Sequence, residues 1–134
     1  MDKIVIDADM DELKRLHIFQ NVNLESIKGL LEACSVKMLE PQEILIAPKK
    51  SNKTVFFILD GQLRIHLDSL DNESIVVLES GESVGEISVI DNQLTSAYVV
   101  ADKTSELLAM NEDILWSLIQ ASHAAACNLL FILA

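Results

Sequence analysis

The 134-residue sequence is poor in several residue types, and each scarcity excludes a class of protein. It has only two cysteines, Cys34 and Cys127, far apart in apolar helical surroundings. That is too few for a secreted disulfide-held domain, so we expect two buried free thiols and a cytoplasmic location. No apolar run has the roughly 20 residues of a membrane-spanning helix, and the acidic N-terminus lacks the apolar region of a secretory signal.

Positive charge is also scarce and unevenly distributed. The chain has 10 Lys and Arg against 21 Asp and Glu, a formal net charge of −11. No arginine follows Arg64, and Lys103 is the only basic residue from Asp71 onward. Nucleic acids and anionic membranes are bound largely through Lys and Arg, so neither is expected as a partner. An anionic ligand of the second half would depend on backbone N–H groups and hydroxyls.

The periodicity of apolar residues divides the chain into three segments of one domain. Residues 10–33 have helical spacing, with Asn23 as a predicted N-cap. Residues 35–110 hold seven or eight short stretches of period two, separated by turn residues. Residues 111–134 return to helical spacing after Asn111, a second predicted N-cap. This order predicts a mainly β domain, a roll or sandwich, flanked by N-terminal and C-terminal helices.

Two connections are predicted to be hairpins. Asp60-Gly61 is a strong two-residue hairpin signal between the apolar stretch 54–60 and the alternating stretch 62–68. A second hairpin tip is predicted at 69–72. The alternation in 62–68 predicts one buried and one solvent-exposed face. The residues expected on the exposed face are Arg64, His66 and Asp68.

The last segment, "ASHAAACNLLFILA", contains no charged residue, no Gly and no Pro. An apolar surface of this kind is unusual on a monomer. We therefore expect a helix that continues in a longer chain or pairs with a second copy, and we predict a homodimer through these helices.

The stretch "GESVGEISVIDNQLTSAYVVA", Gly81 to Ala101, has the residue types of a phosphate-binding loop without a cation. Backbone N–H groups of Ile87 and Ser88 at a helix start favour an anion. Glu86 can accept hydrogen bonds from a diol. Thr95 and Ser96 can donate to phosphate oxygens. The alternative is a tight structural connection with a solvated Glu86, and residue chemistry alone favours that alternative.

Other chemistries have weaker support, and we predict neither catalytic nor metal-ligating residues. The histidines His17, His66 and His123 are widely spaced, and His66 is expected to be a solvated strand residue. The string "GESVG" at 81–85 matches a nucleophile-elbow pattern, but it lacks the parallel α/β context that such an elbow needs.

The whole arrangement resembles the cyclic nucleotide-binding domain family, over roughly Leu13 to Ala134. Members include bacterial cAMP-responsive regulators, protein kinase regulatory subunits and nucleotide-gated channels. The resemblance rests on the helical spacing from Phe19 to Leu30, on "FFILDGQLRI" and above all on the 81–101 stretch, which looks like the phosphate-binding cassette. It implies a jelly-roll-like β-roll with helices on either side and no enzymatic activity.

The resemblance also implies a set of site residues. Gly85 and Glu86 match the Gly-Glu pair, whose Glu contacts the ribose 2′-hydroxyl, and Ile87 and Ser88 match the positions whose backbone meets the phosphate. Ser96 and Ala97 match the residues after the family's phosphate-binding arginine. The arginine position itself falls on Thr95. Loss of that charge-assisted bond is expected to cost about 1.5–3 kcal/mol, or roughly tenfold to a hundredfold in affinity.

The expected function is a regulatory ligand-sensing domain that signals through its C-terminal helices to an output domain or a dimer partner. The ligand would be cAMP, cGMP or another nucleotide, bound weakly or by a retuned site. One alternative is a degenerate roll used for protein–protein contacts, with a pocket filled by Tyr98 or Leu94. A cupin-like enzyme is a further alternative, disfavoured because no His-x-His pair occurs.

Overall fold

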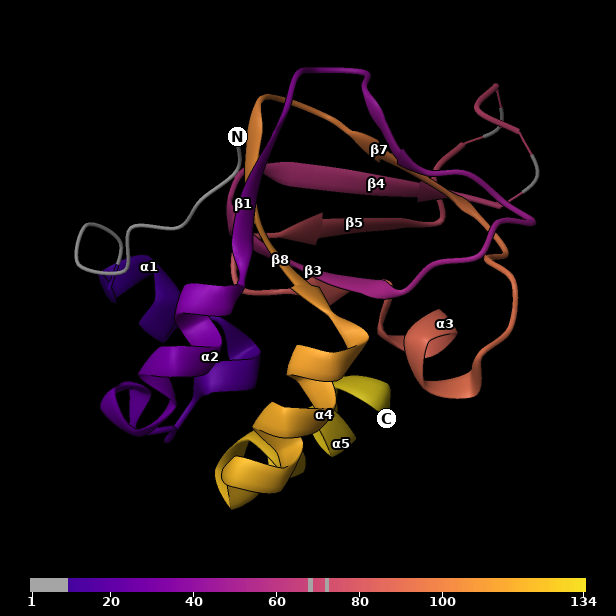
Figure 1. The fold of residues 1–134 in the computed structure, drawn as a ribbon. Helices are drawn as coiled ribbons and strands as arrows, with labels where there is room; N and C mark the ends of the chain where they lie inside the picture. The colour runs from indigo at the N-terminus through magenta and orange to yellow at the C-terminus, as the bar shows by residue number, and fades with distance from the viewer. Residues whose placement is uncertain (1–9, 68, 72) are drawn as a thin grey trace.

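The computed structural model describes residues 10–67, 69–71 and 73–134. Its strands form two antiparallel four-stranded sheets, the β-roll predicted from the sequence (Figure 1). The first sheet has the order β1 (Ser35–Leu39), β8 (Ser105–Asn111), β3 (Thr54–Asp60) and β6 (Ser83–Val84). The second has the order β2 (Ile44–Ile46), β7 (Tyr98–Ala101), β4 (Gln62–His66) and β5 (Val76–Glu79).

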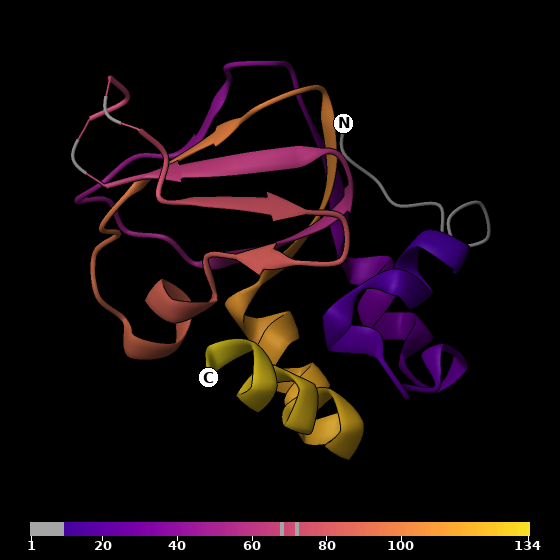
Figure 2. The ribbon, with the colours of Figure 1, turned by 180° about the vertical axis from the view of Figure 1, so that it is seen from behind.

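Helices precede, interrupt and follow the strands. The N-terminal group is α1 (Met10–Arg15), the 3-10 helices η2 (His17–Phe19) and η3 (Leu24–Ile27), and α2 (Lys28–Ala33). Helix α3 (Glu86–Asp91) lies between β6 and β7, and α4 (Glu112–Ala121) and α5 (His123–Leu133) end the chain. Helices α1, α2, α4 and α5 gather below the sheets, whereas α3 lies to one side (Figures 1 and 2). None of the described helices is long and apolar enough to cross a membrane.

Strand β3 is apolar from Val55 to Leu59 because both of its faces are buried there. Phe56 and Ile58 contribute to the core between the two sheets. Val55, Phe57 and Leu59 on the other face belong to the core shared with the helices. The continuous apolar run therefore reflects a strand between two cores.

The two predicted helix caps are confirmed, and a third was missed. The Asn23 and Asn111 side chains accept hydrogen bonds from the backbone N–H groups of Glu25 (3.1 Å) and Ile114 (2.9 Å). Ser122 has an extended backbone with φ −135° and its side chain caps α5. The C-terminal segment is consequently two helices joined at one serine.

The predicted hairpin at Asp60-Gly61 is wrong, because β3 and β4 belong to different sheets. Gly61 instead turns the chain from one sheet to the other, with φ +124°. A Cβ at Gly61 would lie 2.2 Å from Ser105 Oγ, so the turn needs glycine there. Strands β4 and β5 do pair as an antiparallel hairpin, as predicted for the tip at 69–72. Residues 68 and 72 lie outside the described residues.

The prediction of a solvated His66 is also wrong, since its side chain is 5% exposed. Arg64 Nε donates to His66 Nε2 at 3.0 Å, and Arg64 also forms an ion pair with Asp102 at 2.9 Å. This network lies on the polar face of β4. The alternation in the sequence correctly placed Arg64 and His66 on one face, but the expected exposure of His66 was wrong. Asp68, expected on the same face, lies outside the described residues.

The two cysteines are free, but only one is buried. Burial raises the pKa of the Cys34 thiol to about 12, which keeps it protonated and unreactive. Cys127 is exposed on α5, contrary to the expectation of two buried thiols. The apolar neighbours of Cys127 in the sequence do not bury it, because its side of α5 faces away from the core.

Candidate functional site

A cavity of about 530 Å³ opens between the second sheet and the segment 83–99. Every predicted site residue lines it: Gly85, Glu86, Ile87, Ser88, Thr95, Ser96 and Ala97. Its volume lies in the usual range of small-molecule pockets, about 300–1,000 Å³. The fold therefore brings together at one cavity the residues that the sequence placed in one loop.

Gly85 fixes the start of this loop. It precedes α3 with φ +93°, and a Cβ there would lie 2.7 Å from the Thr54 carbonyl oxygen and 2.9 Å from Asn52 Nδ2. Glycine is required both by the left-handed backbone and by the close approach to β3.

Asn52 anchors the loop from the other side, and sequence reasoning missed it because it stands in an ordinary polar loop between β2 and β3. Its Nδ2 donates to the Thr54 carbonyl oxygen at 2.8 Å and to Ser88 Oγ at 3.0 Å. Ser88 Oγ in turn donates to the Gly85 carbonyl oxygen at 3.1 Å. The Ser88 hydroxyl is thus bonded within the loop. The predicted ligand contact of Ser88 is through its backbone, which these side-chain bonds leave unaffected.

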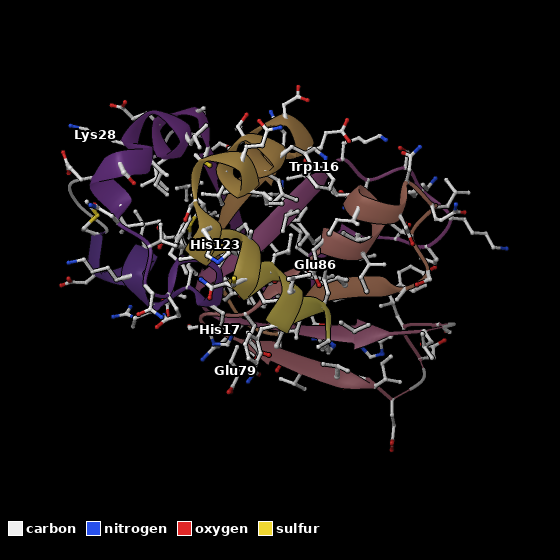
Figure 3. All side chains as sticks on the ribbon, turned by 90° about the horizontal axis from the view of Figure 1, so that it is seen from below. His17, Lys28, Glu79, Glu86, Trp116 and His123 are labelled. Carbon is white, nitrogen blue, oxygen red and sulfur yellow. The ribbon has the colours of Figure 1, made fainter. Side chains whose placement is uncertain are left out.

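Glu86 is mostly buried, whereas the alternative of a purely structural connection predicted a solvated Glu86. It is the first residue of α3, and Figure 3 shows it on the side of this helix next to the strands. Burial raises the pKa of its carboxyl, and its own backbone N–H and the Ser83 hydroxyl oppose this shift only in part. Within the described residues, Glu86 Oε2 and Ser83 Oγ are buried without a partner at hydrogen-bonding geometry. Such atoms are rare in folded proteins.

Thr95, at the arginine position, uses its hydroxyl within the protein. Its Oγ1 donates to the Ala47 carbonyl oxygen at 2.6 Å and accepts from the Lys50 backbone N–H at 2.9 Å. The side chain is 9% exposed. The hydroxyl proton is therefore not free for a phosphate oxygen. The neighbouring Ser96 is exposed.

Within the part of the chain that the structure describes, the lining offers no recognisable catalytic or metal-binding group. Among the described residues, no group of three or more His, Cys, Asp or Glu side chains is arranged to hold a metal ion. Most lining side chains are apolar, and the charged ones are the carboxylates Glu86 and Asp91.

Comparison with protein families gives a match to the cyclic nucleotide-binding domain over residues 36–122. The chain belongs to this family, as the β-roll and its cassette-like loop had indicated. By sequence, no curated protein matches the chain significantly.

Solved structures with the same fold include proteins of several kinds. The catabolite activator protein of Thermus thermophilus superposes with a TM-score of 0.76 at 23% identity, covering 87% of this chain and 56% of that one. The sensor domain of the transcriptional regulator DNR from Pseudomonas aeruginosa superposes with a TM-score of 0.77 at 15% identity, and the match covers 95% of this chain and 87% of that one. The regulatory subunit of a cAMP-independent protein kinase A from Trypanosoma cruzi, bound to guanosine, superposes with a TM-score of 0.74 at 18% identity. This match covers 85% of this chain and 41% of that one.

These identities are low, so the structural matches establish the fold alone. The chain spans about half the length of the Thermus protein and less than half of the Trypanosoma protein.

Proposed function

We propose that this chain is a regulatory module that binds a small molecule in the β-roll pocket and transmits its occupancy through α4 and α5. The observation that carries this proposal is the open cavity of about 530 Å³ at which the predicted cassette residues converge. Family membership supports a ligand-binding role of regulatory type. The proposal includes no enzymatic activity and keeps the cytoplasmic location expected from the sequence.

The packing of α3 supports a connection between pocket and C-terminal helices. Glu86 and Ile87 of α3 line the cavity, whereas Val89 on its inner face belongs to the same core as Leu115 of α4 and Leu129 of α5. A ligand that moves α3 would therefore change the packing of both helices.

Lys53 provides a second link between the same elements. Its Nζ hydrogen-bonds the side chain of Asn92, which ends α3, and lies 3.9 Å from Glu112 Oε2 in the first turn of α4. The backbone N–H of Glu112 also donates to the Lys53 carbonyl oxygen at 2.9 Å. The end of α3 and the start of α4 are thus held by one residue.

The rival proposal, a degenerate roll for protein contacts, requires a pocket filled by its own side chains. Tyr98 is not among the cavity-lining residues, and Leu94 lines the cavity while remaining 61% exposed. The open cavity therefore favours a small-molecule site.

We further propose a homodimer through the C-terminal helices. Phe131 is 84% exposed and Leu130 is 69% exposed, and both lie on α5. Exposed apolar side chains at this density mark a surface that another protein covers. The absence of nucleic-acid and membrane partners stays a prediction from the net charge.

Calorimetric titration with cAMP, cGMP, cyclic di-GMP, adenosine and guanosine tests the proposed function. Saturable binding of at least one compound is expected, and an Ala97→Phe variant that fills the cavity should lose it while keeping its circular dichroism spectrum. If none of the five compounds binds, the proposal of a nucleotide-type sensor is contradicted and the interaction module becomes the better explanation.

A further inference from the structure

The charge of the pocket is opposite to what a phosphate requires. Among the described residues that line the cavity, none is Lys or Arg, whereas Glu86 and Asp91 are carboxylates. Arg64, on the second sheet, is engaged by Asp102. Lys50 touches the cassette through its backbone and does not line the cavity. A phosphate placed here would meet negative charge with no cation from the lining to offset it.

The unpartnered atoms indicate what the pocket accepts instead. Glu86 Oε2 is buried, and an ionised carboxylate only accepts hydrogen bonds, so the missing partner must be a donor. Ser83 Oγ is also buried and makes no hydrogen bond of good geometry within the described residues, although it partly stabilises the Glu86 carboxylate, and it can accept or donate. A pair of ligand hydroxyls can satisfy both atoms, and leaving them unsatisfied is costly.

The rest of the lining is apolar. Ile46, Ile65, Leu78, Val84 and Val99 contribute to it from the two sheets. Such a surface suits the flat, weakly polar body of a small organic molecule, with the polar contacts concentrated at one end.

We propose that the pocket takes a phosphate-free ligand with a planar apolar body and donor hydroxyls directed at Glu86, the chemistry of a nucleoside. This inference rests on the regulatory ligand-binding function proposed above and specifies the ligand class. A nucleoside supplies ribose hydroxyls for Glu86 and Ser83 and brings no anion into the acidic cavity.

Calorimetry on the intact chain with guanosine, adenosine and their 3′,5′-cyclic monophosphates tests the ligand class. At least one nucleoside is expected to bind about tenfold or more tightly than its own cyclic monophosphate. The reason is that the negative charge of the phosphate would have no cation beside it in the cavity. Glu86→Gln should weaken nucleoside binding by about tenfold to a hundredfold, because it replaces a charged acceptor. Glu73→Gln removes the same charge from an exposed position and serves as the matched control.

A gain-of-charge variant tests the same idea in the opposite direction. Leu94 is exposed at the cavity lining, so Leu94→Arg is compatible with the fold. Measured against Leu94→Gln, Leu94→Arg should raise the affinity for the cyclic monophosphate about tenfold relative to the affinity for the nucleoside. Leu94→Gln separates the loss of leucine from the gain of charge.

The outcomes separate the two proposals. If the cyclic monophosphates bind as tightly as the nucleosides or more tightly, the phosphate-free inference is overturned while the sensor function stands. The same holds if Glu86→Gln leaves nucleoside affinity unchanged. If no nucleoside and no cyclic monophosphate binds, the nucleoside inference fails, and the sensor function fails with it only if cyclic di-GMP does not bind either.

Discussion

Glu86 has two properties that both disfavour its charged form. Its carboxylate is buried where the ionised form is poorly solvated, and one of its oxygens has no partner among the described residues. Functional sites commonly retain such costs because the group is needed for binding.

The stability of the protein should therefore depend on the charge of Glu86. The folded state holds this proton more tightly than the unfolded state, so the free energy of unfolding falls as pH rises from the ordinary pKa of 4.5 through the raised one. Glu86→Gln should melt at a higher temperature than wild type near neutral pH, and this advantage should vanish below the ordinary pKa. Thermal melts across that pH range, with Glu73→Gln as control, test this. Equal melting temperatures at neutral pH would contradict it.

Gly85 is the second residue on which the site depends. Gly85→Ala should lose about 1–2 kcal/mol of unfolding free energy from its left-handed backbone, and more from the contact with Thr54. At Gly29 in α2, no atom lies within 4 Å of the position that a Cβ would take, so Gly29→Ala should instead gain up to about 1 kcal/mol. Urea denaturation of both variants distinguishes them. A Gly85→Ala protein as stable as wild type would contradict the expected strain and show that the loop can relax.

At the scale of the element, α5 packs against the N-terminal helices through the shared core and is also hydrogen-bonded to them through Asn128. Asn128 Nδ2 donates to the carbonyl oxygens of Ile18 and Gln20, each at 2.8 Å. This contact joins the start of the described chain to its last helix.

Asn128→Ala should release α5. Loss of two hydrogen bonds, at about 0.5–1.5 kcal/mol each, should speed amide hydrogen exchange in His123–Leu133 while the strands keep their protection. Cys127→Ala changes an exposed neighbour on the same helix and is the control. Unchanged exchange in Asn128→Ala would show that apolar packing alone holds α5.

The sequence predicted the positions of the strands better than it predicted which strands pair and which distant residues form hydrogen bonds. Alternation and turn residues located most strands, because these signals are local. The Asp60-Gly61 turn was misread because a local signal does not state which sheet the next strand joins. Asn52 was missed for the same reason, since its bonds to Gly85 and Ser88 join residues 33 and 36 positions apart.

The predicted site residues all line one cavity, and their role in binding a ligand stays a prediction. Gly85 and Glu86, adjacent at the start of α3, both line the cavity. The Thr95 hydroxyl was expected to face a phosphate, yet it bonds to Ala47 and Lys50, which the sequence separates from it widely.

At the scale of the whole molecule, the exposed end of α5 predicts self-association. Phe131→Lys places a charge in the proposed interface and should shift a dimer to monomer in light scattering. Met38→Lys alters another exposed apolar residue, on β1, which is 53% exposed, and should leave the mass unchanged. A wild-type monomer at high concentration would contradict the dimer.

Signalling from the pocket to the C-terminal helices is tested most directly by amide hydrogen exchange of the intact chain with saturating guanosine or cGMP. We predict added protection in Glu86–Asp91, where the ligand binds, together with altered exchange in His123–Leu133, where the signal arrives. Protection in α3 with no change in α5 would contradict transmission to the C-terminal helices, and unchanged exchange in both segments would contradict the sensor function itself.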